Sequence, residues 1–311
     1  MPAESGWHGI LPVYKPTGLT SHDVVAQVRR LFKQKRVGHA GTLDPGVDGL
    51  LLLCLGKATR LVEYLQSGSK VYEGQFTCGF STNTQDSSGR FVEARLPVDL
   101  AEPKIAAAMA DFVGEIEQVP PMYSAVKKNG QRLYELARQG KEVERKSRKQ
   151  TIRRFSLLSS QRLGMLLQVD FVVECSKGTY IRTLCHDVGS RLGYPAHLSR
   201  LTRVASGSFT LADAYTLQQL SALAQRGGLV QALQPLKAGV THLPCLQLSA
   251  ELIRRVQYGQ RLAGSDLPLG RAEGSEGLVA LLDTEGELAA VYRMEEQEGR
   301  WQWRPEKVLL G

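Results

Sequence analysis

The chain has 311 residues and a net charge of +8, with apolar (42%) and charged (23%) fractions typical of a globular protein of one or two domains. Its longest apolar run, residues 50–55, is far too short for the roughly 20 residues of a membrane-spanning helix. The basic excess lies in residues 127–154, eleven Lys and Arg against three Glu, which indicates either a surface that binds a polyanion or a solvated charged face.

The first predicted element is a helix that starts at Ser21, which stands where an N-cap should be. Apolar residues follow at helical spacing over 24–32, and the helix ends in the basic cluster "KQKR" (33–36). The next stretch, "GHAGTLDPGVDGLLLLCLG" (38–56), places Asp44 in a glycine-punctuated turn before an apolar run. The length of that run and the glycines around it predict a buried strand. A turn and a strand in this combination indicate a rigid element that holds a working loop.

The middle of the chain mixes predicted helices and strands. The segment between 127 and 154 contains a turn at Asn129 and Gly130, and a short amphipathic helix follows it. The other predicted elements are a helix over 57–68, a strand over 70–81, an exposed loop over 82–90, a helix over about 101–112, a strand over 163–175 and a helix over 181–193 closed by a glycine. Helical patterns continue after this last helix to about residue 233.

The residue pattern of the sequence changes near residue 245. Beyond it we expect a helix over 250–260 and short strands within 277–294 and 300–305. We therefore predict two domains, 1–245 and 246–311, the second small and β-rich, with eight basic against eleven acidic residues. Segregated runs of strands and helices favour an α+β fold over a regular βαβ alternation.

Isolated motifs do not indicate a metal or a cofactor. His186 and Asp187 are similar to the metal pair of phosphohydrolases, but no further His and Asp ligands accompany them. The turn "SKGTY" (176–180) opens a helix, yet it lacks the spacing of a nucleotide-binding loop. The five cysteines are far apart and form no CxxC pair, which argues against disulfides and structural zinc. We expect no cofactor and no metal, and the N-terminus shows no secretory signal, so we expect a cytoplasmic protein with no membrane partner.

Five further sequence motifs occur together with the Asp44 turn, in the order in which one known family has them. They are "VYKPTGLTSHDVV" (13–25), "KVYEGQFTCGFSTNTQDSSG" (70–89), "VPPMYSAVKKNGQRLYELARQGKEVERKSR" (119–148), "CSKGTYIRTLCHDVG" (175–189) and "HLSRLTRVASGSF" (197–209). Together the six motifs resemble the TruB family, the tRNA pseudouridine-55 synthases, over about residues 10–210, and the tail resembles the PUA-type RNA-binding module of that family. The chain departs from the family pattern at Gly46, Val47 and Asp48. Asp48 is a second carboxylate four residues away, so the chemistry alone does not distinguish the two. Asp44 is chosen as the catalytic residue because it matches the family motif.

The resemblance implies an enzyme that isomerises uridine 55 to pseudouridine in the T stem-loop of tRNA. The base is flipped, and an aspartate-dependent step breaks the glycosidic bond and re-forms it through C5, without a cofactor. The aspartate either attacks C1′ or assists proton removal to give a glycal, and the sequence does not choose between these routes. The implied fold is a mixed, mainly antiparallel sheet with flanking helices, a central cleft and a C-terminal PUA-like domain. The family suggests a monomer.

The resemblance also assigns roles to residues. Asp44 is the catalytic carboxylate, and Arg182 pairs with it. Tyr72 packs on the uracil, and His39 fills the gap or stacks near the extruded nucleotide. The remaining assignments are Leu201 and Tyr180 in the substrate pocket, Lys15 and Pro16 as supports of the active-site loop, and Lys127, Lys128, Arg132, Lys146, Arg148 and Lys149 on the RNA backbone, within a gripping segment of about 120–154.

Two other classes of function stay open at this point. One is an RNA-binding protein without catalysis, such as a chaperone of tRNA folding. The presence of Asp44, Tyr72 and Arg182 counts against it. The other is a synthase that acts on a different RNA, either directed to rRNA or dependent on a guide RNA. The long basic insert resembles the stand-alone tRNA enzymes and argues against the guide-dependent branch.

Overall fold

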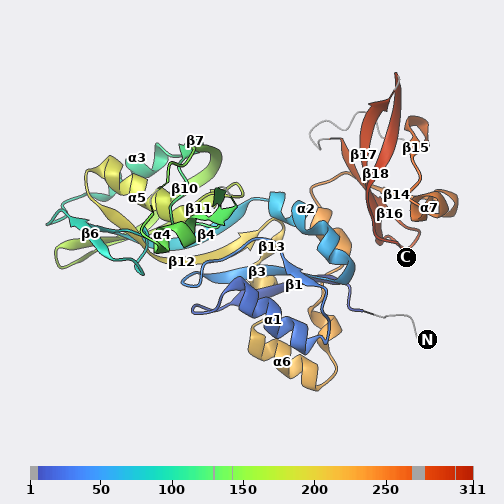
Figure 1. Cartoon of the computed structure of the whole chain (residues 1–311), viewed down its shortest axis with the longest axis horizontal. Helices are drawn as coiled ribbons and strands as arrows, with labels where there is room; N and C mark the ends of the chain where they lie inside the picture. Colours follow the sequence, from blue (N-terminus) through green and yellow to red (C-terminus); the bar gives the residue numbers. More distant parts are fainter. Residues whose placement is uncertain (1–5, 129, 142, 268–276, 298, 311) are drawn as a thin grey trace.

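The computed structural model describes residues 6–128, 130–141, 143–267, 277–297 and 299–310 (Figure 1). Within these ranges the chain forms a nine-stranded sheet, a separate five-stranded sheet near the C-terminus and two short hairpins. None of the helices in these ranges has the length and apolar character needed to cross a membrane.

The large sheet follows the order β1-β3-β12-β4-β11-β10-β7, with β2 paired to β3 and β13 to β12. Its neighbours are antiparallel except β3 and β12, which run parallel. This mixed, mainly antiparallel sheet confirms the predicted α+β class. Its strands are β1 (Gly9–Lys15), β2 (Val37–His39), β3 (Asp48–Leu55), β4 (Lys70–Cys78), β7 (Gly114–Gln118), β10 (Arg148–Leu163), β11 (Leu166–Cys175), β12 (Ala196–Ser206) and β13 (Phe209–Thr210).

Helices flank the two halves of this sheet. Helices α3 and α5 pack against each other, α3 on β10 and α5 on β12, while α1 and α6 pack together beside β1 and β2 (Figure 1). The α-helices are α1 (Ser21–Leu31), α2 (Val62–Ser67), α3 (Glu102–Ala110), α4 (Leu133–Arg138), α5 (Ile181–Leu192), α6 (Leu217–Gln225) and α7 (Ala250–Gln257). Short 3₁₀ segments are η1 (Gly56–Leu61), η2 (Leu211–Asp213), η3 (Leu229–Ala232), η4 (Leu236–Val240) and η5 (Gly264–Asp266).

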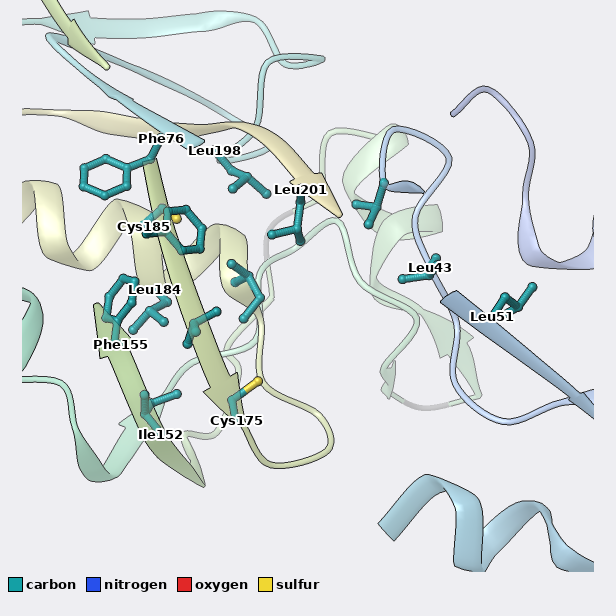
Figure 2. Packing of buried hydrophobic residues seen from close by; sticks show 14 of the residues in the cluster. Leu43, Leu51, Phe76, Ile152, Phe155, Cys175, Leu184, Cys185, Leu198 and Leu201 are labelled. Atoms are coloured by element: carbon teal, nitrogen blue, oxygen red, sulfur yellow. The ribbon is translucent and has the colours of Figure 1, made fainter. Parts of the chain in front are cut away.

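The leucine run after the Asp44 turn is the predicted buried strand, β3. Leu51 and Leu53 join the main core with α1, whereas Leu50 and Leu52 face a second cluster that includes Leu65 of α2. Because both faces of β3 are covered, the strand needs no polar alternation. Figure 2 shows the main core continuing between the strands and α5, where Phe76, Phe155 and Leu184 pack together.

Two helices differ from the prediction. The N-cap of α1 is Thr20, which forms a capping box with Asp23, and Ser21 is the first helical residue. The helix predicted over 57–68 is instead a 3₁₀ turn, η1, followed by the six-residue α2 that ends before Gly68. The helices predicted over 101–112 and 181–193 are α3 and α5, and α5 ends at the left-handed Gly193 (φ 81°).

Helical patterns were predicted from α5 to residue 233. This prediction holds for α6 and η3 but is wrong over residues 196–206, which form the central strand β12. Bulges in β12 after Leu198 and after Arg203 break its alternation, so Leu198 and Leu201 are spaced as in a helix. The 16-residue β10 was not predicted, for a related reason. Most of its side chains are polar, more than half are exposed, and a bulge after Ile152 shifts its apolar face.

Two short hairpins and α4 lie in the same part of the chain as the large sheet. The hairpins join β5 (Phe80–Thr82) to β6 (Phe91–Ala94), and β8 (Lys127–Lys128) to β9 (Gln131–Arg132). Helix α4 is the short amphipathic helix predicted in the basic segment. Of the turn predicted there, Asn129 lies outside the described residues.

The five-stranded sheet has the order β14-β16-β17-β18-β15. It lies apart from the large sheet in Figure 1, next to α2. Leu278 and Val291 of this sheet form one apolar cluster with Leu61 of η1 and Tyr64 of α2. The strands are β14 (Cys245–Gln247), β15 (Leu262–Ala263), β16 (Leu278–Leu282), β17 (Leu288–Gln297) and β18 (Arg300–Val308).

Candidate active site

The loop that carries Asp44 is fastened by neighbours on both sides. The backbone N–H of Leu43 donates to Ser21 Oγ (2.9 Å), and Ser21 Oγ donates back to the Leu43 carbonyl (3.2 Å). The N–H of Gly18 donates to the Pro45 carbonyl (2.8 Å). Because Ser21 is buried at the start of α1, the loop is tied to a helix before it and to β3 after it.

Lys15 holds the neighbouring loop, residues 16–19, through its ammonium group. This lysine is fully buried at the end of β1, and its Nζ donates to the carbonyls of Pro16 (3.0 Å) and Leu19 (2.7 Å). Burial lowers the pKa of Lys15, whereas the nearby carboxylates of Asp48 and Asp44 oppose the shift. Lys15 therefore fixes the chain that contacts the Asp44 loop.

Arg182, on α5, reaches Asp44 with an Nη2–Oδ2 distance of 3.0 Å. Its side chain is only 10% exposed, whereas that of Asp44 is 51% exposed. The guanidinium also donates to Asp86 Oδ2 (3.3 Å) and to the carbonyls of Thr84 (3.2 Å) and Tyr123 (2.9 Å). Arg182 is thus held from several directions and presents one edge to a carboxylate that solvent, or a substrate, can reach.

The second carboxylate of the turn, Asp48, has different partners. Its Oδ2 accepts from the Tyr14 hydroxyl (2.7 Å), and its Oδ1 accepts from Thr202 Oγ1 (2.6 Å). The hydrogen bond to Asp48 raises the pKa of Tyr14. Asp48 therefore joins β1, β3 and β12, and both of its oxygens are occupied.

An inner cavity of about 420 Å³ opens beside Asp44. Tyr72 lies in its wall on β4, at the register position opposite Arg203 of β12. Burial raises the pKa of Tyr72, and the positive charge of Arg203 opposes that shift. Predicted site residues that line this cavity are Asp44, Tyr72, Tyr180, Arg182 and Leu201.

An outer cavity of about 690 Å³ meets the inner one at Asp44 and Arg182, which line both. Two predicted RNA-contact residues, Lys127 and Arg132, line this outer cavity. Two guanidinium groups lie near the Tyr134 ring there, with Arg132 at 5.8 Å and Arg138 at 5.5 Å from its centroid. The two cavities form the predicted cleft.

The structure does not bring the remaining predicted basic residues to either cavity. Lys128 Nζ donates to the Glu144 carbonyl (2.5 Å), and Lys149 forms an ion pair with Glu115 (3.6 Å). Lys146 and Arg148 are exposed beside them, outside both cavity walls.

His39 likewise lies outside both cavity walls, at the end of β2. Its ring packs edge-on against His22 (5.6 Å between centroids), and His22 lines the outer cavity. Burial, with the charges of His22 and Arg203, lowers the pKa of His39. Among the described histidines, the one in a cavity wall is therefore His22, which the sequence reasoning did not single out.

The sequence reasoning also missed two charged residues of the site. Asp86 lies in a loop whose composition indicated only exposure, yet it holds Arg182. Arg203 is 2% exposed, and its guanidinium donates to the carbonyls of Leu50 (2.7 Å) and Gly41 (3.1 Å). The resemblance covered both segments, but no local pattern marked either residue.

No group of three or more His, Cys, Asp and Glu that could hold a metal occurs in the described part of the chain. His186 contacts only its neighbour Asp187 among carboxylates there (3.3 Å). Cys185 is fully buried, and burial raises its thiol pKa well above the usual value. Neither residue lines the two cavities.

Comparison with known proteins decides the family. A model of the TruB family pseudouridylate synthase N-terminal domain matches residues 29–181, and a model of the tRNA pseudouridylate synthase B C-terminal domain matches residues 182–241. The chain belongs to the TruB family. It is similar to tRNA pseudouridine synthase B of Geobacillus thermodenitrificans (strain NG80-2), with 46% identity over 91% of this chain and 94% of the relative. The corresponding protein of Bacillus subtilis (strain 168) is 42% identical over 97% of this chain and 98% of the relative.

Solved structures agree with the TruB assignment. The fold is similar to a chain in the crystal structure of a Cbf5-Nop10-Gar1 complex, with a TM-score of 0.75 and 31% identity over 97% of this chain and 85% of that chain. A chain from an H/ACA RNP bound to a substrate RNA containing 2′-deoxyuridine gives a TM-score of 0.73 and 28% identity, over 98% of this chain and 86% of that chain.

Proposed function

We propose that this TruB-family enzyme isomerises uridine 55 to pseudouridine in the T stem-loop of tRNA, with Asp44 as its catalytic carboxylate. The relatives named tRNA pseudouridine synthase B support the reaction and the substrate. The observation that supports the choice of Asp44 is its position: it stands where the two cavities meet, paired with a buried arginine and still half exposed.

The two cavities suit the two parts of the substrate. A target base inside a folded RNA loop has to be turned out to be reached. The outer cavity, with Lys127, Arg132 and Arg138 in its wall, suits the RNA loop. The inner cavity, with Tyr72 and Leu201 in its wall, suits the flipped uracil.

Within this arrangement Asp44 attacks C1′ of the ribose or removes a sugar proton, and Arg182 pairs with its carboxylate and orients it. RNA that fills both cavities excludes water from the half-exposed carboxylate, and that strengthens its interaction with Arg182. Attack on C1′ and formation of a glycal both use the same carboxylate, and both remain routes of the proposal.

The deciding experiment uses one unmodified tRNA transcript. We expect the enzyme to convert uridine 55, and no other uridine, to pseudouridine, as mapped by base-specific chemical labelling. A transcript that is bound but stays unmodified would favour the chaperone function. Conversion of an rRNA fragment in place of tRNA would favour a synthase for another RNA.

Substitutions at Tyr72 separate stacking from proton transfer. Tyr72→Phe keeps the ring, so we expect less than about a threefold loss in single-turnover rate. Tyr72→Leu removes a stacking contact worth about 1–3 kcal/mol and should cost about fivefold to more than a hundredfold. Melting temperatures of both variants control for loss of fold. An inactive Tyr72→Phe enzyme would assign the hydroxyl a part in proton transfer.

Binding should depend steeply on salt, because neutralised phosphates release counterions. Replacing Lys127 and Arg132 with glutamine should weaken tRNA binding and flatten the salt slope by about one unit for each lost phosphate contact. The exposed arginines of two remote ion pairs, Arg162 and Arg191, are the control pair for the same change. An unchanged slope in the first variant would contradict the assignment. The triple replacement of Lys146, Arg148 and Lys149 then tests how far the grip extends along β10.

We also propose that the chain divides near residue 245, and that the separate C-terminal sheet is a PUA-like RNA-binding module. The five-stranded sheet that begins with β14 supports this division. The acidic balance of the module argues for a contact narrower than that of the basic segment. The enzyme is proposed to act as a monomer in the cytoplasm, and sedimentation of the free protein tests the first point.

A further inference from the structure

The inner cavity carries more positive charge than the Asp44–Arg182 pair requires. Its wall also contains Lys70, Lys177 and Arg203. Lys70 is 5% exposed and Arg203 is 2% exposed, whereas Lys177 lies at the rim and is exposed. Four cations therefore line this cavity, and Asp44 is the one carboxylate among its described wall residues.

Among the described residues, none of the three additional cations has a carboxylate partner. Arg203 donates to two backbone carbonyls, and Lys70 Nζ donates to the carbonyls of Gly68 (2.6 Å) and Gln66. Over the ranges that the structure describes, no ion pair involves any of the three. Buried charges are usually paired, because an uncompensated charge is costly to remove from water. Burial lowers the pKa of Lys70 to about 8. The positive charges of Arg203 and Lys177 add to this shift, and Cys175 opposes it.

The reaction creates a negative charge at the step that breaks the glycosidic bond. The C1′–N1 bond breaks with its electron pair left on N1, so the detached uracil is an anion whose charge spreads to its carbonyl oxygens. Carbon C1′ forms a bond to the Asp44 carboxylate, or Asp44 removes the C2′ proton and the sugar becomes a glycal, and the leaving group is the same by both routes. When C5 joins C1′, the bond between Asp44 and C1′ breaks, or C2′ of the glycal takes its proton back from Asp44, and the carboxylate is restored. The new bond makes the base neutral, and the later loss of a proton from C5 and gain of one at N1 leave it neutral. The charge therefore exists only while the base is free.

We propose that Lys70, Lys177 and Arg203 form an anion site that stabilises the detached uracil inside the cavity. This inference rests on the proposed isomerisation of uridine. Fixed charges aimed at a developing charge accelerate a reaction most in a cavity that excludes water, and the backbone contacts of Lys70 and Arg203 hold both cations in place before the reaction starts. The same attraction keeps the free base in the cavity while it turns to present C5.

The cleanest test is Lys177→Gln, because Lys177 is exposed and its removal leaves the core intact. At saturating tRNA we expect the single-turnover rate to fall about tenfold, less than the hundredfold or more seen when a direct donor to a developing anion is removed. The affinity for tRNA and the melting temperature should stay at wild-type values. Lys104→Gln, an exposed lysine on α3 remote from both cavities, is the matched control. Weaker tRNA binding with an unchanged rate would make Lys177 a phosphate contact and overturn the proposal.

A change in the leaving group tests the charge directly. Fluorine at C5 withdraws electrons and stabilises the uracil anion without help from the protein. With a transcript that carries 5-fluorouridine at position 55, Lys177→Gln should slow consumption of the nucleoside by a smaller factor than with uridine. Equal factors for the two substrates would contradict an anion site.

Lys70→Gln extends the test to a buried member. The glutamine amide keeps donors for the carbonyls of Gln66 and Gly68 while the charge is lost, so a correctly folded variant should show the same dependence on the leaving group. A wild-type enzyme that leaves uridine 55 unmodified would refute the proposed function. An active wild type with unimpaired Lys177→Gln and Lys70→Gln variants would refute the anion site alone.

Discussion

Asp44→Asn should abolish isomerisation while tRNA binding stays nearly intact. The amide keeps the size of the side chain but cannot attack C1′ or take up a proton, so we expect the single-turnover rate to fall by at least about 10⁴-fold, the scale on which a lost nucleophile or base acts in other enzymes. Binding should persist because the outer cavity and its cations are untouched. Mapping of position 55 measures the rate, and filter binding measures the affinity.

Asp48→Asn is the matched comparison, four residues along the same chain. Asp48 accepts hydrogen bonds from Tyr14 and Thr202, and the asparagine retains one acceptor for them. We expect a loss of stability of about 1–3 kcal/mol, seen as a lower melting temperature, and a rate within tenfold of wild type. Turnover in Asp44→Asn together with an inactive Asp48→Asn would show that Asp48 is the catalytic carboxylate.

The parts of the fold that could be predicted from the sequence are those with an undisturbed pattern. The leucines of β3 and the apolar face of α5 identify their elements because both are buried along their whole length. Strand β12 could not be predicted, since two bulges turn its period of two into a spacing that resembles a helix. The N-cap of α1 was predicted one residue too late because Thr20 and Ser21 are both suited to cap a helix. The structure uses Thr20 as the cap, and the hydroxyl of Ser21 forms hydrogen bonds with the Asp44 loop instead.

The residues of the site also divide into those that the sequence predicted and those that it did not. The family motifs named Asp44, Tyr72 and Arg182, and the structure brings all three to one cavity. A buried arginine such as Arg203 was missed because a cation inside a strand pattern is usually read as facing solvent. Its burial depends on carbonyl groups of Gly41 and Leu50, more than 150 residues earlier in the chain, and no local pattern reports such a contact.

Arg182 is the residue whose loss should do most harm after Asp44. It contacts Asp44, Asp86 and the carbonyls of Thr84 and Tyr123, and these contacts come from three separate segments. A planar guanidinium supplies five donors in a fixed fork, whereas an ammonium group is a single point with three. Lysine at this position keeps the charge, but three donors on one nitrogen cannot serve all four acceptors, Asp44, Asp86 and the two carbonyls, at once.

We therefore expect Arg182→Lys to lower the single-turnover rate by about a hundredfold or more, because small errors in the position of a reacting group have effects of that size. The affinity for tRNA should change much less. Arg191→Lys is the control, since Arg191 lies on the same helix and pairs with Asp111 at 2.7 Å outside both cavities. A general weakening of α5 would slow both variants and lower both melting temperatures. Loss of orientation at Asp44 would slow only Arg182→Lys, and a fully active Arg182→Lys enzyme would show that catalysis does not require the pair.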